Sequence, residues 1–255
     1  MHRVDLNADC GESFGTYRLG NDEQLFRYIT SANIACGFHA GDPNIMRRTV
    51  RLAVNAGVSI GAHPGFPDLI GFGRRNMEIL KDELENYVLY QLGALYAVAK
   101  AEKKQLTHVK AHGALYNTAC SRADYAEAIV KAMKSFSRDL ILIAPQNFKI
   151  VEVAQAEGLK VGFEFFADRN YTSQGTLVPR THENALLKDI NQIARRAVKV
   201  IKEGKVESVD GKEIQMNVHT ICVHGDTPHA VEIARNLRKS LENEGIAITK
   251  LCELI

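Results

Sequence analysis

Short apolar runs rich in β-branched residues alternate with longer amphipathic segments from one end of the chain to the other. The short runs predict seven strands, and the longer segments predict helices that connect one strand to the next. Such alternation is typical of a parallel sheet covered by crossover helices. A further short run at 246–249 is an eighth candidate whose placement is open. The seven expected strands lie near residues 3–9, 32–36, 58–62, 106–110, 140–144, 160–166 and 218–223.

Capping residues mark the ends of several expected helices. Asp42 and Pro43 are suited to the N-cap and the first turn, and Gly57 follows where a left-handed cap is expected. Thr227-Pro228 repeats this start signal near the end of the chain. A helix expected over 82–103 begins with acidic residues and ends with basic ones, which complements its macrodipole.

Length and composition fit one α/β domain over residues 1–255. With 45% apolar residues, the chain can bury a sizeable core. Lys and Arg number 32 against 30 for Asp and Glu, so no broad basic field attracts nucleic acid. The sequence has neither a signal-peptide pattern nor a run of about 18 apolar residues, and its five cysteines form no CxxC pair. We therefore expect a cytoplasmic protein without membrane or nucleic-acid partners.

Polar residues gather at the C-terminal end of the first expected strand, which is the binding end in parallel α/β folds. Strict alternation places Asp5, Asn7 and Asp9 on one face, and the polar run continues to Glu12 in the following loop. Three polar residues on one face of a buried central strand need hydrogen-bonding partners, which favours a functional site. An edge strand with one solvent-exposed face would give the same pattern. We favour the functional interpretation.

The ends of the later strands add histidines, a lysine and further carboxylates. His39 follows the second expected strand, and His63 lies at the end of the third. Each is either a structural residue or a ligand. A ring of strands brings nearly all strand ends to one mouth, whereas an open sheet uses a switch point served by few strands. The distribution therefore favours a barrel. The other charged or imidazole groups at strand ends are Lys110, His112, Glu164, Asp168, Arg169, His224 and Asp226.

Two loops add guanidinium groups, which suit carboxylates or phosphates. Arg74 and Arg75 follow two glycines in one loop, and Arg180 lies in another. The sequence contains no GxxxxGK[ST], no GxGxxG after a strand and no GxSxG, which excludes the commonest nucleotide-binding and serine-hydrolase motifs. Cys10 or Cys36 beside a histidine would allow a thiol enzyme, but buried reduced cysteines explain them better.

Eight ordered motifs between Asp5 and Asp226 resemble the LamB/YcsF family, so the resemblance covers essentially the whole chain. Ala111 departs from the family pattern, in which proline is expected. The motifs are DLNADCGE at 5–12, NIACGFHAGDP at 33–43, HPGFPD at 63–68, GFGRR at 71–75, KAHGALYN at 110–117, EFFADR at 164–169, LVPR at 177–180 and VHGD at 223–226.

The resemblance implies both a fold and a reaction. The fold is a seven-stranded barrel similar to those of sugar deacetylases and glycosidases. Members of the family are known as the A subunits of 5-oxoprolinase, which implies ATP-dependent opening of 5-oxo-L-proline to L-glutamate in a complex with B and C subunits. ATP with Mg²⁺ would be the co-substrate, because a resonance-stabilised lactam is a poor electrophile until its oxygen is phosphorylated.

The expected site residues fall into a catalytic, a binding and a metal-ligating group. Lys110 would supply positive charge for phosphoryl oxygens, and Glu164 or Asp226 would orient an imidazole. The catalytic group is Asp9, Lys110, His112, Glu164, His224 and Asp226. The substrate- or phosphate-binding group is Asn7, Glu12, Arg74, Arg75, Arg169 and Arg180. By analogy with deacetylase barrels, a divalent metal could instead be held by Asp9, His39 and His63.

Two other functions compete with ATP-dependent lactam hydrolysis. One is a metal-dependent amidohydrolase of the deacetylase kind that acts without ATP. The other is a binding subunit that holds substrate while its partners react. The mixture of acids, bases and cations expected at one mouth exceeds what binding a small acid requires, and this favours an enzyme.

Overall fold

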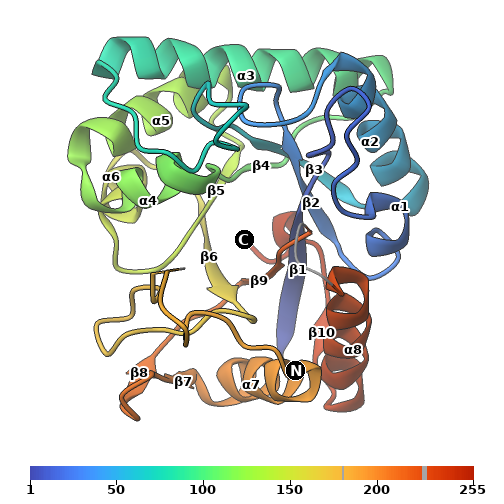
Figure 1. The fold of residues 1–255 in the computed structure, drawn as a ribbon, viewed down its shortest axis with the longest axis vertical. Helices are drawn as coiled ribbons and strands as arrows, with labels where there is room; N and C mark the ends of the chain where they lie inside the picture. The colour runs from blue at the N-terminus through green and yellow to red at the C-terminus, as the bar shows by residue number, and fades with distance from the viewer. Residues whose placement is uncertain (180, 226–228) are drawn as a thin grey trace.

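The computed structural model describes residues 1–179, 181–225 and 229–255. Its central feature is a closed ring of seven parallel strands surrounded by helices (Figure 1). Each strand pairs with the next along the ring, and the last strand pairs with the first, from Asp5–Thr220 to Ala8–Val223. The predicted seven-stranded barrel is therefore confirmed. The ring consists of β1 (Arg3–Cys10), β2 (Ser31–Ala35), β3 (Ser59–His63), β4 (His108–Val109), β5 (Ile141–Ala144), β6 (Val161–Phe166) and β9 (Thr220–Val223).

Helices cover the outside of the ring, and α3 and α5 lie side by side along it (Figure 1). In the described part of the chain, no helix has both the length and the apolar character needed to cross a membrane. The helices are α1 (Asp22–Leu25), α2 (Pro43–Ala56), α3 (Lys81–Ala101), α4 (Gly113–Ser121), α5 (Ala123–Phe136), α6 (Lys149–Ala156), α7 (Ile190–Glu203), α8 (Ala230–Asn243) and the 3₁₀ helix η1 (Leu251–Glu253).

Several predicted helix ends are confirmed by their capping contacts. The Asp42 side chain accepts hydrogen bonds from the first backbone N–H groups of α2, and Gly57 ends this helix with a φ of 69°. Helix α3 occupies residues 81–101, close to the expected 82–103. The start signal at Thr227-Pro228 lies outside the described residues.

Two elements lie beside the ring. Strand β10 (Ala247–Ile248) pairs with the beginning of β1 and takes no part in closing the barrel, which settles the placement of the eighth candidate. Strands β7 (Lys205–Glu207) and β8 (Glu213–Gln215) form an antiparallel hairpin that the sequence analysis missed. Gly211, in the turn between them, has a φ of 76°.

The N-terminal end of the barrel interior is closed by a satisfied polar network. One carboxylate oxygen of Asp5 accepts hydrogen bonds from Thr30 Oγ1 at 2.8 Å, Ser31 Oγ at 2.7 Å and the backbone N–H of Leu251 at 3.2 Å. The other oxygen accepts from the hydroxyl of Thr220. Because β1 pairs on both sides, with β2 and β9, the edge-strand alternative for its polar face is wrong.

Candidate active site

A buried lysine links two carboxylates at the opposite, C-terminal end of the ring. Lys110 follows β4, and its Nζ lies 3.0 Å from Asp9 Oδ1 and 2.8 Å from Glu164 Oε1. Burial alone would lower the pKa of Lys110, but Asp9, Glu164 and the other negative neighbours together outweigh it and raise that pKa well above its usual value. The lysine is therefore a permanent cation at the mouth of the barrel.

The two carboxylates have further partners on β2 and on helix α4. Asn33 of β2 donates its side-chain N–H to Asp9 at 2.9 Å, and the Tyr116 hydroxyl donates to Glu164 at 3.0 Å. Burial would raise the pKa of Asp9, but the charges of His63 and Lys110 hold it well below its ordinary range. Asp9 is thus ionised at neutral pH.

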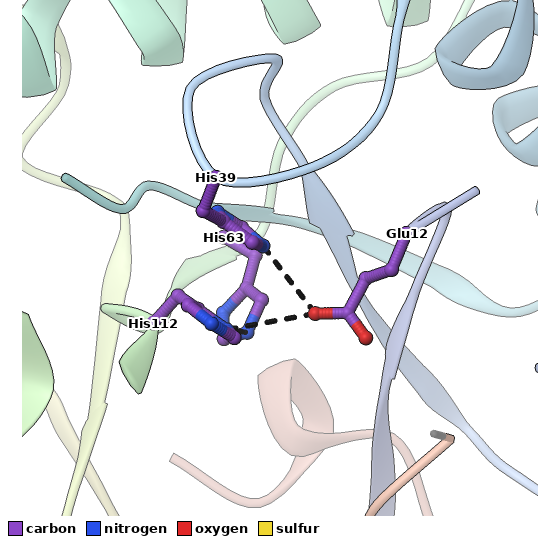
Figure 2. A group of neighbouring side chains, drawn as sticks. All are labelled: Glu12, His39, His63 and His112. Atoms are coloured by element: carbon purple, nitrogen blue, oxygen red, sulfur yellow. Dashed lines mark hydrogen bonds and ion pairs between the residues drawn. The ribbon is translucent and has the colours of Figure 1, made fainter. Parts of the chain in front are cut away.

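Three histidines and a glutamate meet beside this ion-pair group and form what we call the histidine cluster: Glu12, His39, His63 and His112 (Figure 2). Glu12 Oε1 lies 3.3 Å from His39 Nε2 and 3.5 Å from His112 Nδ1. The rings of His39 and His112 stack with centroids 3.7 Å apart, and His63 lies edge-on to both. Burial lowers the pKa of His112 to about 3 and that of His39 well below its usual value, so both rings are neutral.

The loop after β3 closes over the cluster. Phe72 has a positive φ of 54°, and its carbonyl oxygen lies 2.8 Å from His112 Nε2. At Gly73, which has a φ of 62°, an added Cβ would lie 2.7 Å from His39 Cβ and 2.9 Å from His112 Cδ2. The glycine-rich stretch, which was expected to approach an anion, therefore packs closely against the side chains of His39 and His112.

The histidine cluster could hold a metal ion, since its four ligand atoms all lie within 4.8 Å of one another. Two of the three expected metal ligands, His39 and His63, belong to it. Asp9 does not: it belongs to a separate group with Cys222 and His224. A divalent ion in the histidine cluster would supply a Lewis acid for a carbonyl oxygen or lower the pKa of a bound water.

A carboxylate orients His224, and among the described residues it is Asp168 and not the expected Glu164. His224 Nδ1 lies 3.0 Å from Asp168, while Glu164 pairs with Lys110 instead. Asp226, the other expected partner, lies outside the described residues. With its Nδ1–H donated to Asp168, a neutral His224 keeps its Nε2 as the proton acceptor.

The expected binding residues are dispersed. Arg75 pairs with Asp68, and Arg169 is buried with its guanidinium 2.6 Å from the carbonyl oxygen of Val178, where it ties down the loop after β6. Asn7 lies deeper in the barrel and bonds Thr220. Arg180 lies outside the described residues.

Arg74 is the described arginine that remains beside the mouth. Its guanidinium carbon lies 4.9 Å from the centre of the Phe72 ring, and its charge contributes to the lowered pKa values of His39 and His112 after burial and the neighbouring histidines. Arg74 therefore lies close enough to the histidine cluster for its charge to act on two of its rings.

Comparisons with known proteins identify the family. Residues 4–255 match the LamB/YcsF family. The chain belongs to the LamB/YcsF family. It is 53% identical over 253 residues to the 5-oxoprolinase A subunit of Pyrococcus horikoshii, with 99% of each chain covered, and 49% identical over 255 residues to that of Alkaliphilus metalliredigens, with 100% of each covered.

Solved structures support the same assignment. The crystal structure of a lactam utilization protein from Thermus thermophilus superposes with a TM-score of 0.93 at 46% identity, covering 96% of this LamB/YcsF chain and 98% of that one. A structure described as T48 deacetylase with substrate gives a TM-score of 0.51 at 15% identity, covering 99% and 90% of the two chains. This remote likeness shows the shared fold.

Sequence reasoning missed the roles of three residues in the site. Asp168 was counted among the charged groups at strand ends but was given no role; it stands four residues after Glu164 and two residues beyond the end of β6. Phe72 acts through its backbone carbonyl, and Cys222 Sγ lies 3.1 Å from Lys110 Nζ. No sequence pattern predicts either contact.

Proposed function

We propose that this chain is the A subunit of an ATP-dependent 5-oxoprolinase that opens 5-oxo-L-proline to L-glutamate in the cytoplasm. The names of its relatives support this function, since they are 5-oxoprolinase A subunits and a lactam utilization protein. The chain would act in a complex with B and C subunits, and ATP with Mg²⁺ would be the co-substrate.

The observation that carries the proposal is the buried Lys110 held between Asp9 and Glu164. A ring nitrogen of His224 lies within 4.8 Å of a carboxylate oxygen of Asp9, so a proton acceptor and a fixed cation share one mouth. A lactam needs both, because negative charge develops on its oxygen while a proton leaves the attacking water and another reaches its nitrogen.

The proposed reaction balances with one ATP and two waters. The γ-phosphoryl group moves from ATP to the lactam oxygen, which releases ADP and makes the ring carbon electrophilic. Water then adds to that carbon and loses a proton, and the C–N bond breaks as the nitrogen takes up a proton. A second water cleaves the resulting acyl phosphate to L-glutamate and inorganic phosphate.

The mouth residues would divide this chemistry as follows. Lys110 neutralises the charge on the lactam or phosphoryl oxygens, and Arg74 binds the incoming anion. Asp9 and His224 carry protons between water and the leaving nitrogen, with Asp168 fixing the ring of His224.

A second function is favoured by one observation, the histidine cluster. Its donor set could hold a metal ion that activates water for direct amide hydrolysis without ATP. Under this alternative the chain alone would open an amide, and neither ATP nor partner subunits would be required.

The deciding experiment measures 5-oxoproline-dependent phosphate release from ATP. We expect none from this chain alone and robust release after addition of the B and C subunits, with a complex containing Lys110→Gln reduced by at least about 100-fold. A complex with Lys149→Gln, altered in an exposed lysine on α6, is the control. Amide hydrolysis by the chain alone, or normal turnover by the Lys110→Gln complex, would overturn the proposal.

A further inference from the structure

A row of residues in register crosses four neighbouring strands of the ring. Asp9 of β1 is in register with Asn33 of β2. Asn33 is in turn in register with Gly61 of β3, and Gly61 with His108 of β4. A Cβ at Gly61 would collide with the ring of His108, so the missing side chain leaves room for this fully buried ring to cross β3. His108 Nε2 thereby comes within 3.0 Å of Asn33 Oδ1.

The contacts of Lys110 fix which way round the Asn33 amide lies. Lys110 Nζ lies 3.0 Å from Asp9 Oδ1 and 3.4 Å from Asn7 Oδ1, and an ammonium only donates, so both oxygens are acceptors. Asn33 Nδ2 lies 2.9 Å from the first of these oxygens and 2.8 Å from the second. The end of the amide that faces them is therefore its NH₂ group, and its carbonyl oxygen faces His108.

The ring of His108 is consequently a donor at Nε2, because the Asn33 oxygen that it meets only accepts. Burial, and after it the charge of Lys110, lowers the pKa of His108 to about 3, so the ring is neutral and holds no second proton. Nδ1 is then bare and accepts from the Thr107 hydroxyl at 2.8 Å. The same hydroxyl lies farther, at 3.3 Å, from the carbonyl oxygen of Ile60. Thr107 thus holds the tautomer in which Nε2 donates.

We propose that His108 is a positioning residue for Asp9 and acts through Asn33. Its N–H holds the amide oxygen of Asn33 and so directs the amide nitrogen at Asp9 Oδ1. Asn33 and Lys110 both contact this one carboxylate oxygen, so together they set the direction of the other, Oδ2, to which proton transfer falls. Without His108, a buried amide oxygen loses its donor and the amide is free to turn away from Asp9. This role rests on the proposed 5-oxoprolinase function, in which Asp9 transfers protons.

A matched pair of substitutions tests the donor. His108→Gln and His108→Met have side chains of equal length, but only glutamine keeps an N–H group. In the complex with B and C subunits, we expect His108→Met to lower kcat by about 10- to 100-fold, with the KM for 5-oxoproline within about twofold of wild type. His108→Gln should keep kcat within about threefold of wild type. A purely structural role would lower the melting temperature and leave the kcat of the folded protein unchanged.

A control variant and a double variant show whether the effect passes through Asn33. His219→Leu, at a histidine that accepts from the backbone N–H of Phe163, should keep wild-type kcat. Asn33→Ala should lower kcat as His108→Met does, and combining the two should cost less than about twofold more than Asn33→Ala alone. Losses that multiply would overturn the proposal. So would equal losses in His108→Gln and His108→Met, or wild-type kcat in His108→Met shown to be folded by circular dichroism.

Side-chain nitrogen NMR shifts of the chain alone test the orientation without any activity. We expect His108 to be neutral with its proton on Nε2, and the Asn33 amide resonances to move in His108→Met. A proton on Nδ1 would overturn the proposal. The wild-type shifts decide this even if His108→Met fails to fold. They also decide it if the wild-type complex shows no 5-oxoproline-dependent phosphate release, a result that would count against the proposed function alone.

Discussion

The two ends of the barrel interior both bury polar side chains, but they treat them differently. At the N-terminal end, the Asp5 carboxylate is enclosed by three hydroxyl donors and a backbone N–H. At the C-terminal mouth, the nitrogens of His63 and His112 face each other and the carboxylate of Glu12. Both sets come from alternating polar positions on the same ring of strands or from the loops that follow them.

This difference distinguishes buried polar side chains that complete the structure from those that stand at a binding end of the barrel. A buried polar group costs less when its hydrogen bonds are made than when they are not. The network around Asp5 is complete and closes the barrel. The mouth instead brings several ionisable side chains together, which is how binding sites depart from the rules for cores.

The largest expected effect on stability comes from Lys110→Met. The substitution leaves Asp9 and Glu164 buried without their shared cation, so the free energy of unfolding should fall by about 3–5 kcal/mol in urea titrations. Lys149→Met, which removes an exposed partner of Glu152, should change it by less than about 1 kcal/mol. Equal losses in the two variants would contradict the account of the buried pair.

Asp5 should make stability depend on pH. Burial raises the pKa of Asp5 from 3.8 to about 6, so the folded protein holds this proton more tightly than the unfolded chain does. The contribution of Asp5 to stability is therefore complete below about pH 4 and is lost as the pH rises to about 6, by about 3 kcal/mol. Urea titrations across this range should show the slope in the wild type and a flatter profile in Asp5→Asn. A profile unchanged by Asp5→Asn would contradict this role.

A pair of glycines tests how tightly the loop after β3 packs on the cluster. Gly57 and Gly73 both have left-handed backbones, but an added Cβ meets nothing within 4 Å at Gly57, whereas at Gly73 it meets His39 and His112. Gly57→Ala should cost about 1–2 kcal/mol of unfolding free energy, and Gly73→Ala about 1–3 kcal/mol more. Indistinguishable variants would show that the loop does not pack closely there.

The smallest expected effect is that of Tyr116→Phe, which removes the hydroxyl that donates to Glu164. A hydrogen bond to a charged acceptor contributes modestly, so the loss of unfolding free energy should be about 1.5 kcal/mol. Lys110 still neutralises Glu164 in this variant. A loss as large as that of Lys110→Met would mean that the hydroxyl, and not the ammonium, stabilises the carboxylate.

The barrel and most of the ionisable residues at its mouth could be predicted from the sequence, because both depend on local patterns. Period-two alternation in residues 3–9 set the inward face of β1, and the Asp42-Pro43 and Gly57 signals fixed the ends of α2. The concentration of ionisable groups at strand ends pointed to the mouth. The β7–β8 hairpin was missed because its strands have three residues each.

The pairings within the site could not be predicted, because they depend on which strands become neighbours across the ring. Glu164 was expected to orient an imidazole, yet it faces Lys110, and Asp168 takes that role for His224. Glu12 was expected to bind substrate, but the turn after β1 carries it to His39 and His112. Arg169 was expected to bind an anion, but its guanidinium donates to the carbonyl oxygen of Val178 in the loop after β6.

One measurement tests the distinction between the two ends most directly: 5-oxoproline-dependent phosphate release by the reconstituted complex, with this chain carrying either Asp9→Asn or Asp5→Asn. The two substitutions make the same chemical change on the same strand, four residues apart. We predict a loss of at least about 100-fold for Asp9→Asn and activity within about twofold of wild type for folded Asp5→Asn. Comparable activity in the two complexes would contradict the assignment of the mouth as the catalytic end.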